Sequence, residues 1–516
     1  MSYVVHPFIA PNKVEERSYQ INMVRGCIDT NTLLILPTGL GKTIVALYVA
    51  VEFLPKGKVL ILAPTKPLLD QHQKTFTELM VGHSLCIISG ETAPEKRAEM
   101  MAQNDVIIAT PQTVANDLKE GRYSMDPFSL VIYDEAHRGV GDYAYVTVAE
   151  YCSNSIRSIG MTASPGANIN KIKEVCGNLN LRRIDAKTED DPDVSPYVHD
   201  TYITEVRLKL PEDLLKIDYL LKKQLGVYVN NLVALKLMNP ARPPTRGHFL
   251  DVQRMLQARL NSGEKTSTVY RGLSLTAKGI KILHAMKLAE TQGITPLRIY
   301  LEKIEAESEQ ERGGRSAKEI IGTPEYQEMR KIVDTTNVEH PKVSKTMSIV
   351  SRTINDDPGS KVMVFTELRD TCEMMVAKLS TIPGAKVAKL IGQSKEGMSQ
   401  KEQVALLDKL RSGEVNVIVA TSVGEEGLDI SSTNAVIFYE PVPSEIRTIQ
   451  RRGRTGRKND GDVYVLIVED TMDEGTEAAS KRKEQTMRDN IERLNEELKR
   501  GRPINPHGTQ RGLDDF

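Results

Sequence analysis

The sequence of 516 residues predicts two α/β domains with parallel sheets, together with an all-helical domain inserted between them. Short runs of valine, isoleucine and leucine alternate with helix-length segments from Thr32 to Ser164, and the same pattern returns from Lys361. Continuous apolar runs bounded by turn residues are typical of parallel strands that are buried on both faces. From about residue 200 to residue 340 this pattern is replaced by leucines at helical spacing, which indicates a bundle of helices.

Four segments follow from these patterns. The first α/β domain covers residues 1–199, the helical domain 200–340 and the second α/β domain 341–470, and residues 471–516 form a charged helix and a tail. The strands predicted in the first domain are TLLILPT, KVLILAPT, LCIIS, DVIIAT, LVIYDEA and IRSIGMTAS. Those predicted in the second domain are KVMVFTE, KVAKLIG, VNVIVATS, AVIFYEP and VYVLIVE.

Charge is balanced over the whole chain, since 68 lysines and arginines face 69 aspartates and glutamates. Any surface for nucleic acid must therefore be local. Residues 221–300 carry 13 basic side chains and three acidic ones, a surplus of ten positive charges. We expect this segment to bind nucleic acid through Lys222, Lys223, Lys236 and Lys278. The alternative is that these residues form a solvated helical face, because most runs of charged residues do.

Neither a membrane segment nor a secretion signal is apparent. The N-terminus MSYVVHPFIAP has no charged region followed by an apolar core, and the longest apolar stretch, Ile44 to Leu54, is too short to span a bilayer. The five cysteines are widely spaced and form no C-x-x-C pair, which argues against a disulfide framework or a zinc site. We expect a soluble, cytoplasmic protein with reduced cysteines and no membrane partner.

The segment LILPTGLGKT, residues 34–43, predicts a phosphate-binding loop between a strand and a helix. In such a loop backbone N–H groups bind the phosphates of a nucleotide, a lysine reaches the outer phosphates and a hydroxyl binds Mg²⁺. Lys42 and Thr43 supply these side chains, so the predicted cofactors are ATP and Mg²⁺. Leu36 stands where the usual pattern has its first glycine. The predicted nucleotide-binding residues are Pro37, Thr38, Gly39, Leu40, Gly41, Lys42 and Thr43.

The segment LVIYDEAH supplies the carboxylates that such a loop needs. Its apolar residues predict a buried strand, and Asp134 and Glu135 follow at the carboxyl end, where α/β proteins place their nucleotide sites. Asp134 is the candidate ligand of Mg²⁺, and Glu135 is the candidate that orients and deprotonates the attacking water. The pattern thus predicts ATP hydrolysis.

Several motifs in a fixed order resemble those of superfamily 2 helicases. They are PTGLGKT, DEAH, TAS (Thr162 to Ser164), VATSVGEEGLDI (Val419 to Ile430) and QRRGRTGR (Gln450 to Arg457). That family does not require the first glycine of the loop, so Leu36 fits the resemblance. The resemblance implies two RecA-like domains that close on ATP, and it covers most of the chain outside the insertion and the tail.

The resemblance also gives roles to residues outside the loop. Arg17 and Gln20 in RSYQ look like the element that reads adenine, and Asp429 resembles the family's ribose contact. Arg454 and Arg457 look like arginine fingers, which stabilise the charge on the transferred phosphoryl group. The remaining roles that the resemblance implies are ATP sensing by Gln450 and His137 and strand contacts by Lys66, Thr110, Thr366 and Thr421.

The basic helical insertion, DEAH and EHPKVSKTMSIV (Glu339 to Val350) together resemble the archaeal Hef and FANCM branch of superfamily 2. That resemblance implies a thumb-like insertion that grips branched DNA, 3′ to 5′ translocation, and remodelling of stalled forks or Holliday junctions in DNA repair. Full-length archaeal Hef usually carries a nuclease domain, and no site of the G-D-x(n)-E-R-K-x-x-x-D type follows Arg457. The chain is therefore either a fragment or a member of a lineage without the nuclease.

Two other functions remain open. RIG-I-like and Dicer helicases share the position of the insertion and most motifs, so an RNA-acting helicase is the runner-up. A scaffold that binds nucleic acid without hydrolysing ATP is the second alternative, although Lys42, Asp134, Glu135, Arg454 and Arg457 are all present.

The chain ends in QRGLDDF, where Gln510, Leu513 and Phe516 have a spacing that resembles the peptide by which replication proteins dock on the sliding clamp, PCNA. Positions three apart share one face of a short 3₁₀ helix, so Leu513 and Phe516 would fill an apolar pocket. The preceding GRPINPHGT is rich in turn residues. If the peptide binds the clamp, we also expect the chain to be complete at Phe516.

Overall fold

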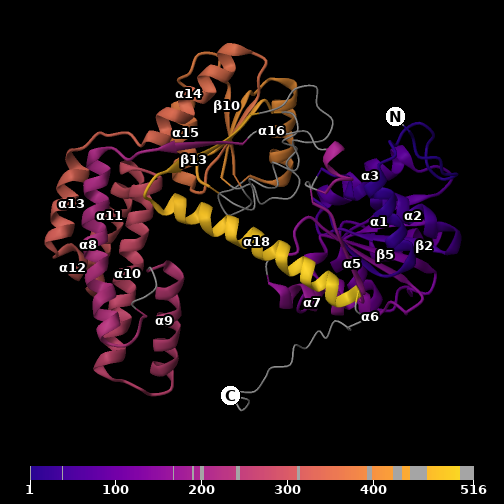
Figure 1. Cartoon of the computed structure of the whole chain (residues 1–516), viewed down its shortest axis with the longest axis horizontal. Helices are drawn as coiled ribbons and strands as arrows, with labels where there is room; N and C mark the ends of the chain where they lie inside the picture. The colour runs from indigo at the N-terminus through magenta and orange to yellow at the C-terminus, as the bar shows by residue number, and fades with distance from the viewer. Residues whose placement is uncertain are drawn as a thin grey trace.

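The computed structural model of the chain describes residues 2–37, 39–166, 168–188, 191–197, 203–239, 244–310, 314–391, 398–421, 433–441 and 462–499. It contains two α/β domains and a helical bundle, and one long helix, α18 (Met472–Lys499), runs between these parts (Figure 1). The predicted fold class is therefore confirmed.

The first domain is a seven-stranded parallel sheet in the order β3-β4-β2-β5-β6-β1-β7. Its central strands β1, β4 and β5 are buried along their whole length, which explains their continuous apolar sequences. The strands are β1 (Thr32–Ile35), β2 (Lys58–Leu62), β3 (Leu85–Ile88), β4 (Val106–Ala109), β5 (Phe128–Asp134), β6 (Arg157–Thr162) and β7 (Arg183–Ala186). The helices are α1 (Ser18–Asp29), α2 (Lys42–Phe53), α3 (Lys66–Leu79), α4 (Pro94–Gln103), α5 (Pro111–Lys119), α6 (Ala144–Glu150) and α7 (Ile169–Asn178), with the 3₁₀ turns η1 (Leu54–Lys56), η2 (Ala136–Arg138) and η3 (Ser195–Tyr197).

The second domain is a six-stranded parallel sheet in the order β10-β11-β9-β12-β13-β8. Strands β9, β11 and β12 are again buried at every position. The strands are β8 (Ile203–Leu208), β9 (Val362–Phe365), β10 (Val387–Leu390), β11 (Val417–Ala420), β12 (Ala435–Phe438) and β13 (Asp462–Val468). The helices of this domain are α14 (Pro341–Asp356), α15 (Arg369–Leu379) and α16 (Gln400–Ser412).

The edge strands β7 and β8 differ from the prediction. Strand β8 pairs in parallel with β13, from Ile203 opposite Val463 to Leu208 opposite Val468. The insertion predicted over residues 200–340 therefore begins after Leu208 and lies within the second domain, not between the two domains. Both edge strands carry charged residues and are only partly buried, because an edge strand has one unpaired side. They lack the apolar run by which the sequence reveals a buried strand.

The insertion is a bundle of helices with its own apolar core. Its elements are α8 (Glu212–Ala234), α9 (Arg246–Asn261), α10 (Ser267–Thr291), α11 (Ile294–Ser308), α12 (Arg315–Ile321) and α13 (Pro324–Thr335). The core contains leucines at helical spacing along α8, such as Leu214, Leu221 and Leu225. Phe249 of α9 packs directly against Gly279 of α10. A Cβ at position 279 would lie only 2.1 Å from the ring of Phe249, so this glycine lets the two helices approach closely. Across the described ranges, no helix has the length and apolar content to cross a membrane.

Helix α18 starts at the second domain and ends on the first (Figure 1). Its side chains Met487, Ile491 and Leu494 are buried in the apolar core of the first domain. Ser164 of the TAS motif donates a hydrogen bond to the sulfur of Met487 at 3.4 Å. The helix predicted at the start of residues 471–516 is therefore a structural link between the domains.

A buried polar cluster joins the insertion, the second domain and the start of α18. Glu290 of α10 accepts a hydrogen bond from the backbone N–H of Met472, with 2.7 Å between N and Oε2. Nearby, Lys342 of α14 and Asp473 of α18 form an ion pair of 2.7 Å, and both side chains are almost inaccessible to solvent. Removal of either charge would leave the other buried without compensation, so this contact fixes the start of α18.

Glu440, which follows β12, holds the same junction from the second domain. Its Oε1 accepts a hydrogen bond from the amide of Gln292 at 2.6 Å, and its Oε2 accepts one from the backbone N–H of Glu367 at 3.0 Å. Burial raises the pKa of Glu440 to about 7. Burial and the neighbouring Asp218 also raise the pKa of Glu290 to about 7.

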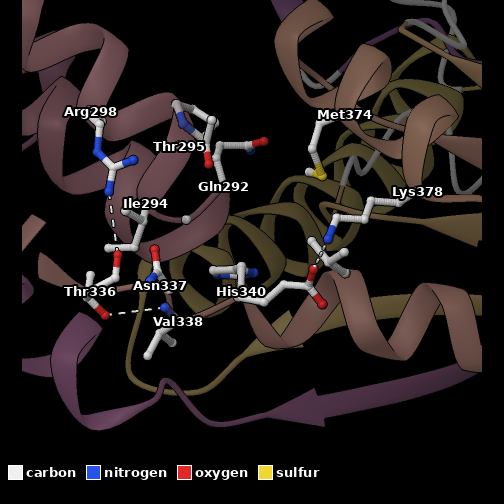
Figure 2. Close-up of a pocket in the computed structure, with 14 residues that line it drawn as sticks. Gln292, Ile294, Thr295, Arg298, Thr336, Asn337, Val338, His340, Met374 and Lys378 are labelled. Carbon is white, nitrogen blue, oxygen red and sulfur yellow. Dashed lines mark hydrogen bonds and ion pairs between the residues drawn. The ribbon is translucent and has the colours of Figure 1, made fainter. Parts of the chain in front are cut away.

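A pocket opens beside this junction, between the start of α11 and helix α15 (Figure 2). Lys378 of α15 pairs with Glu339 at 2.7 Å, and Arg298 of α11 donates to the carbonyl of Val333 at 2.6 Å. These charged groups already have partners within the protein. The pocket is therefore part of the joint between the insertion and the second domain.

The two buried glutamates predict a pH dependence of stability. In the unfolded chain they lose their protons near the ordinary pKa of 4.5, whereas in the folded chain they keep them until about pH 7. The folded state then binds more protons in this window, so their contribution to the free energy of unfolding falls as pH rises from about 4.5 to 7. We predict that Glu440→Gln lowers the excess of protons bound by the folded state by about one. The free energy of unfolding of this variant should therefore fall less steeply as pH rises.

Thermal unfolding midpoints measured from about pH 5 to pH 8 would test this prediction. Glu302→Gln, at an exposed position of α11, is the matched control and should follow the wild type. Parallel curves for the wild type and Glu440→Gln would contradict the prediction.

Candidate nucleotide and nucleic-acid sites

The candidate nucleotide site lies at the carboxyl edge of the first sheet. The loop of residues 36–41 follows β1, Thr162 ends β6 and Asp134 ends β5, and these three strands are neighbours in the order β5-β6-β1. Because all strands of the sheet are parallel, their carboxyl ends meet on one side. The fold thus brings together the loop, the DEAH motif and the TAS motif.

The backbone of the phosphate-binding loop depends on its last glycine. Gly41 caps α2 with φ of +83°, a left-handed conformation that side chains rarely adopt. A Cβ at this position would also lie 2.4 Å from the amide nitrogen of Gln20. Lys42, the first residue of α2, donates to the carbonyl of Leu36 at 3.3 Å. Its ammonium is thus held across the loop, and the N-terminus of α2 lies at the end of this loop, where the helix dipole would favour an anion.

The residues of the predicted adenine-reading element lie beside this loop. Gln20 on α1 is buried, and its amide donates to the carbonyl of Leu40 at 3.1 Å. Arg17, which precedes α1, pairs with Glu15 at 3.2 Å and lies over the ring of Tyr197. Gln20 thus contacts the loop, whereas the contacts of Arg17 are with Glu15 and Tyr197, and the adenine-reading role of both stays a prediction.

Asp134 is buried at the end of β5 and is held from several sides. Its Oδ2 lies 2.8 Å from Nε2 of His72, and its Oδ1 accepts the backbone N–H of Glu135 at 3.0 Å. The pKa of Asp134 lies below its ordinary value: burial raises it, but the hydrogen bond and charge of His72 and the charge of Lys42 outweigh burial. Asp134 is therefore an ionised carboxylate.

Glu135 adopts φ of +50°, which is unusual for a residue other than glycine. Strain of this kind is common where a side chain must be aimed at a reacting group. Its carboxylate lies 3.3 Å from Nδ1 of His137, and the same nitrogen lies 3.1 Å from the hydroxyl of Thr162. Thr162 in turn donates to the carbonyl of Ser164 at 3.1 Å. The DEAH and TAS motifs are thus joined by hydrogen bonds.

The residues at this edge fit Mg²⁺. This ion usually takes one or two carboxylates together with substrate phosphates and water, not an all-protein cage. Within the described part of the chain, no cluster of three or more His, Cys, Asp or Glu side chains could hold a metal by itself. Asp134, at the end of β5, and the hydroxyl of Thr43, in the first turn of α2, are the residues that would hold such an ion.

The predicted strand contacts follow neighbouring strands in each sheet. Lys66 begins α3 after β2, and Thr110 caps α5 after β4. Thr366 and Thr421 follow β9 and β11, and the backbone N–H of Thr366 donates to the carbonyl of Ala420 at 2.9 Å. Thr366 differs from the expectation in one respect. It is buried, and its hydroxyl faces protein carbonyls, so it is not directed toward a phosphate here.

Some predicted residues lie outside the described ranges. They are Thr38, Asp429, Gln450, Arg454 and Arg457 of the nucleotide site and Gln510, Leu513 and Phe516 of the clamp peptide. Their roles stay predictions.

The lysines predicted to bind nucleic acid in the insertion are mostly engaged elsewhere. Lys222 pairs with Asp218 at 2.6 Å and with Glu290, Lys223 pairs with Glu325 at 3.1 Å, and Lys278 is buried against Glu319 at 2.6 Å. Three of the four acids, Asp218, Glu319 and Glu325, lie outside residues 221–300, so the count over that segment missed them. Contact of these three lysines with nucleic acid stays a prediction. A surplus of charge along the sequence is therefore not a surplus at the surface.

Other basic side chains are exposed along α9 and in the connections on either side of it. Lys236, Arg246, Arg259 and Lys265 are exposed, and none of the four has an ion-pair partner among the described residues. Lys236 was predicted and the other three were not, since the sequence gives no sign of which basic residues meet an acid. Arg246 begins α9, whereas Arg259 and Lys265 lie in its last turn and in the connection to α10. We call Arg259 and Lys265 the basic tip. Helix α9 lies on the side of the bundle turned toward the first domain (Figure 1).

Three protein families match consecutive parts of the chain. Residues 13–167 match "Type III restriction enzyme, res subunit", residues 214–340 match "Putative ATP-dependent RNA helicase, helical bundle", and residues 342–459 match "Helicase conserved C-terminal domain". The matches follow the first domain, the insertion and the second domain in order.

Similar proteins cover nearly the whole chain. "Putative ATP-dependent RNA helicase MJ1505" of Methanocaldococcus jannaschii is 36% identical over 94% of this chain and 62% of its own length. "ATP-dependent DNA helicase mph1" of Sclerotinia sclerotiorum is 33% identical over 95% of this chain and 42% of its own length. The chain thus spans less than two thirds of these relatives. The crystal structure of the Pyrococcus furiosus Hef helicase domain matches with a TM-score of 0.74 and 38% identity, over 90% of this chain and 98% of that domain.

The geometry of the nucleotide site predicts different defects for its two charged groups. Glu135→Gln should lower the rate of ATP hydrolysis by ~10²-fold or more and leave nucleotide bound, because only the base is lost. Lys42→Ala should weaken nucleotide binding itself, since the ammonium lies in the loop. Binding of a fluorescent ATP analogue and steady-state hydrolysis separate the two effects, with Glu150→Gln on the surface of α6 as control. Hydrolysis by Glu135→Gln near the wild-type rate would refute the role of this residue.

Proposed function

Because the chain belongs to the Hef and FANCM family of superfamily 2 helicases, we propose that it is an ATP-dependent DNA helicase that moves 3′ to 5′. Its substrates in this proposal are branched DNAs such as stalled forks and Holliday junctions, and its role lies in repair. The cofactors are ATP and Mg²⁺, and the compartment is the cytoplasm.

The close contact of Glu135 with His137, together with the hydrogen bonds between His137 and Thr162 and between Thr162 and Ser164, carries this proposal. They connect the group that would activate water with the TAS motif, and Ser164 also contacts α18, which reaches the second domain. A change at the γ-phosphate therefore has a structural route to the relative position of the two domains. A translocase needs such coupling between hydrolysis and domain movement, and a passive scaffold does not need it.

The ion pair and hydrogen bonds around Asp134 disfavour the scaffold further. A scaffold has no need to keep an aspartate ionised in a buried position, next to a strained glutamate and a loop lysine. The runner-up, an RNA helicase, is kept because one relative is named as an RNA helicase and another as a DNA helicase.

ATPase stimulation separates the two substrates. We predict that forked and four-way DNA stimulate hydrolysis more than single-stranded DNA, and that double-stranded RNA stimulates it least, at matched salt. The assay uses Glu135→Gln as the background. Stimulation by double-stranded RNA above that by every DNA would overturn the DNA proposal, and hydrolysis no faster than the Glu135→Gln background with any nucleic acid would favour the scaffold.

Within this proposal the basic tip contacts the duplex arms of the branch. Each phosphate contact that is lost should reduce the slope of log affinity against log salt by about 0.9. We predict that Arg259→Gln with Lys265→Gln weakens forked DNA more than single-stranded DNA and makes this slope shallower. The matched control is Lys216→Gln with Lys409→Gln, which removes the same charge but from lysines paired with Glu212 and Glu414. Equal losses in both double variants would show that net charge matters and the tip does not.

The sliding clamp is a second proposed partner, through Gln510, Leu513 and Phe516. Calorimetric titration of a peptide of residues 501–516 against the clamp, with Leu513→Ala and Phe516→Ala as control, tests it. Absence of binding, or binding that ignores the double substitution, would remove this partner.

A further inference from the structure

His72 occupies a position on α3 that would ordinarily be apolar. The buried face of this helix consists of Leu69, His72 and Phe76, and His72 is only 2% exposed. Placing an imidazole in a core costs free energy unless its polar atoms are satisfied. Among the described residues, Nδ1 of this ring has no partner, and Nε2 has one, the carboxylate of Asp134 at 2.8 Å. The contact with Asp134 is therefore the reason that a histidine can be accommodated here.

The direction of this hydrogen bond follows from its partners. The oxygen of an ionised carboxylate can only accept, so Nε2 carries the proton and donates it to Oδ2. The other oxygen accepts the backbone N–H of Glu135 at 3.0 Å. Tyr145 adds a hydrogen bond to the backbone carbonyl of Asp134. The carboxylate plane is thus fixed from two sides, and each oxygen keeps a lone pair for a cation.

Helix α3 also carries a candidate contact to the nucleic acid. Lys66 is its first residue, six positions before His72, which corresponds to about 9 Å along the helix axis. In this structure the ammonium of Lys66 pairs with Glu91 at 2.6 Å, and both side chains are exposed. A phosphate that binds Lys66 would compete with Glu91 for it. Any resulting shift of α3 would also move His72, because the buried part of a helix moves as a rigid unit.

We propose that His72 is a positioning residue that orients the magnesium carboxylate of Asp134, and that α3 links this carboxylate to the nucleic-acid contact at Lys66. The proposal rests on the proposed function, since it assumes that Asp134 binds Mg²⁺ and Lys66 binds DNA. It adds a residue that contacts neither nucleotide nor DNA but acts on both through one helix.

The effect of such a residue is measurable apart from turnover. Mutation of a residue that orients a metal ligand commonly lowers metal affinity or activity by about 10- to 100-fold. The matched variants are His72→Gln and His72→Leu. The amide nitrogen of glutamine can take the place of Nε2 and donate to Asp134, whereas leucine fills the space without a donor.

The first experiment measures ADP binding by calorimetry with Mg²⁺ and with EDTA. In the wild type Mg²⁺ should tighten ADP. The ratio of ADP affinity in Mg²⁺ to that in EDTA should be about 10-fold smaller in His72→Leu than in the wild type, while the affinity in EDTA is unchanged. His72→Gln should keep most of the wild-type ratio. His340→Leu is the control, because His340 is also buried and hydrogen-bonded to a protein oxygen, the carbonyl of Glu290 at 3.0 Å, but lies in the second domain. Wild-type tightening in His72→Leu, or equal losses in the leucine and glutamine variants, would overturn the positioning role.

The second experiment measures the affinity for single-stranded DNA with and without a magnesium complex of a non-hydrolysable ATP analogue. The ratio of the two affinities is the coupling between the sites, and it is the same whichever ligand is varied. We expect this ratio to fall toward one in His72→Leu and to persist in His72→Gln. An unchanged ratio in His72→Leu would overturn the link through α3. A wild type that shows no coupling and no DNA-stimulated hydrolysis would instead refute the proposed function, so the two failures are distinguishable.

Discussion

Two all-parallel sheets place the carboxyl ends of their strands on one edge each, and the candidate chemistry of this chain depends on that constraint. A parallel strand can be followed by its neighbour only after a crossover, so each strand end receives its own loop. In the first domain these loops bring the phosphate-binding loop, Asp134 and Thr162 together although they are far apart in sequence. In the second domain the same geometry puts Thr366 and Thr421 side by side.

The ionised state of Asp134 requires more than its place at a strand end. Burial alone would favour the neutral acid, which is a poor ligand for a cation. The hydrogen bond from His72 and the charge of Lys42 reverse that preference, so helix α3 and the phosphate-binding loop both contribute to the state of one carboxylate. Glu135 is placed by the backbone, whose positive φ turns its side chain away from the strand direction and toward His137.

The position of the insertion within the second domain changes how the parts can move. Since β8 belongs to the second sheet and precedes α8, the chain enters and leaves the insertion from the same domain. The buried contacts of Glu290, Lys342 and Glu440 add to this attachment. The insertion and the second domain are thus joined by covalent connections and buried polar contacts. Helix α18 extends from this joint to the first domain, where it covers part of that domain's core.

The sequence by itself determined the two sheets, the helical character of the insertion and the nucleotide site. These features depend on local patterns: apolar runs specify buried strands, and glycines and carboxylates at strand ends specify a phosphate site. Only the tertiary structure revealed the edge strand β8, because its charged, half-exposed residues carry no such pattern. It also decided which basic residues are available, since Lys278 meets Glu319 only after folding, whereas Arg259 meets no acid among the described residues. The Lys278–Glu319 salt bridge and the His72–Asp134 contact join residues that are distant in sequence, and no local pattern can specify such pairs.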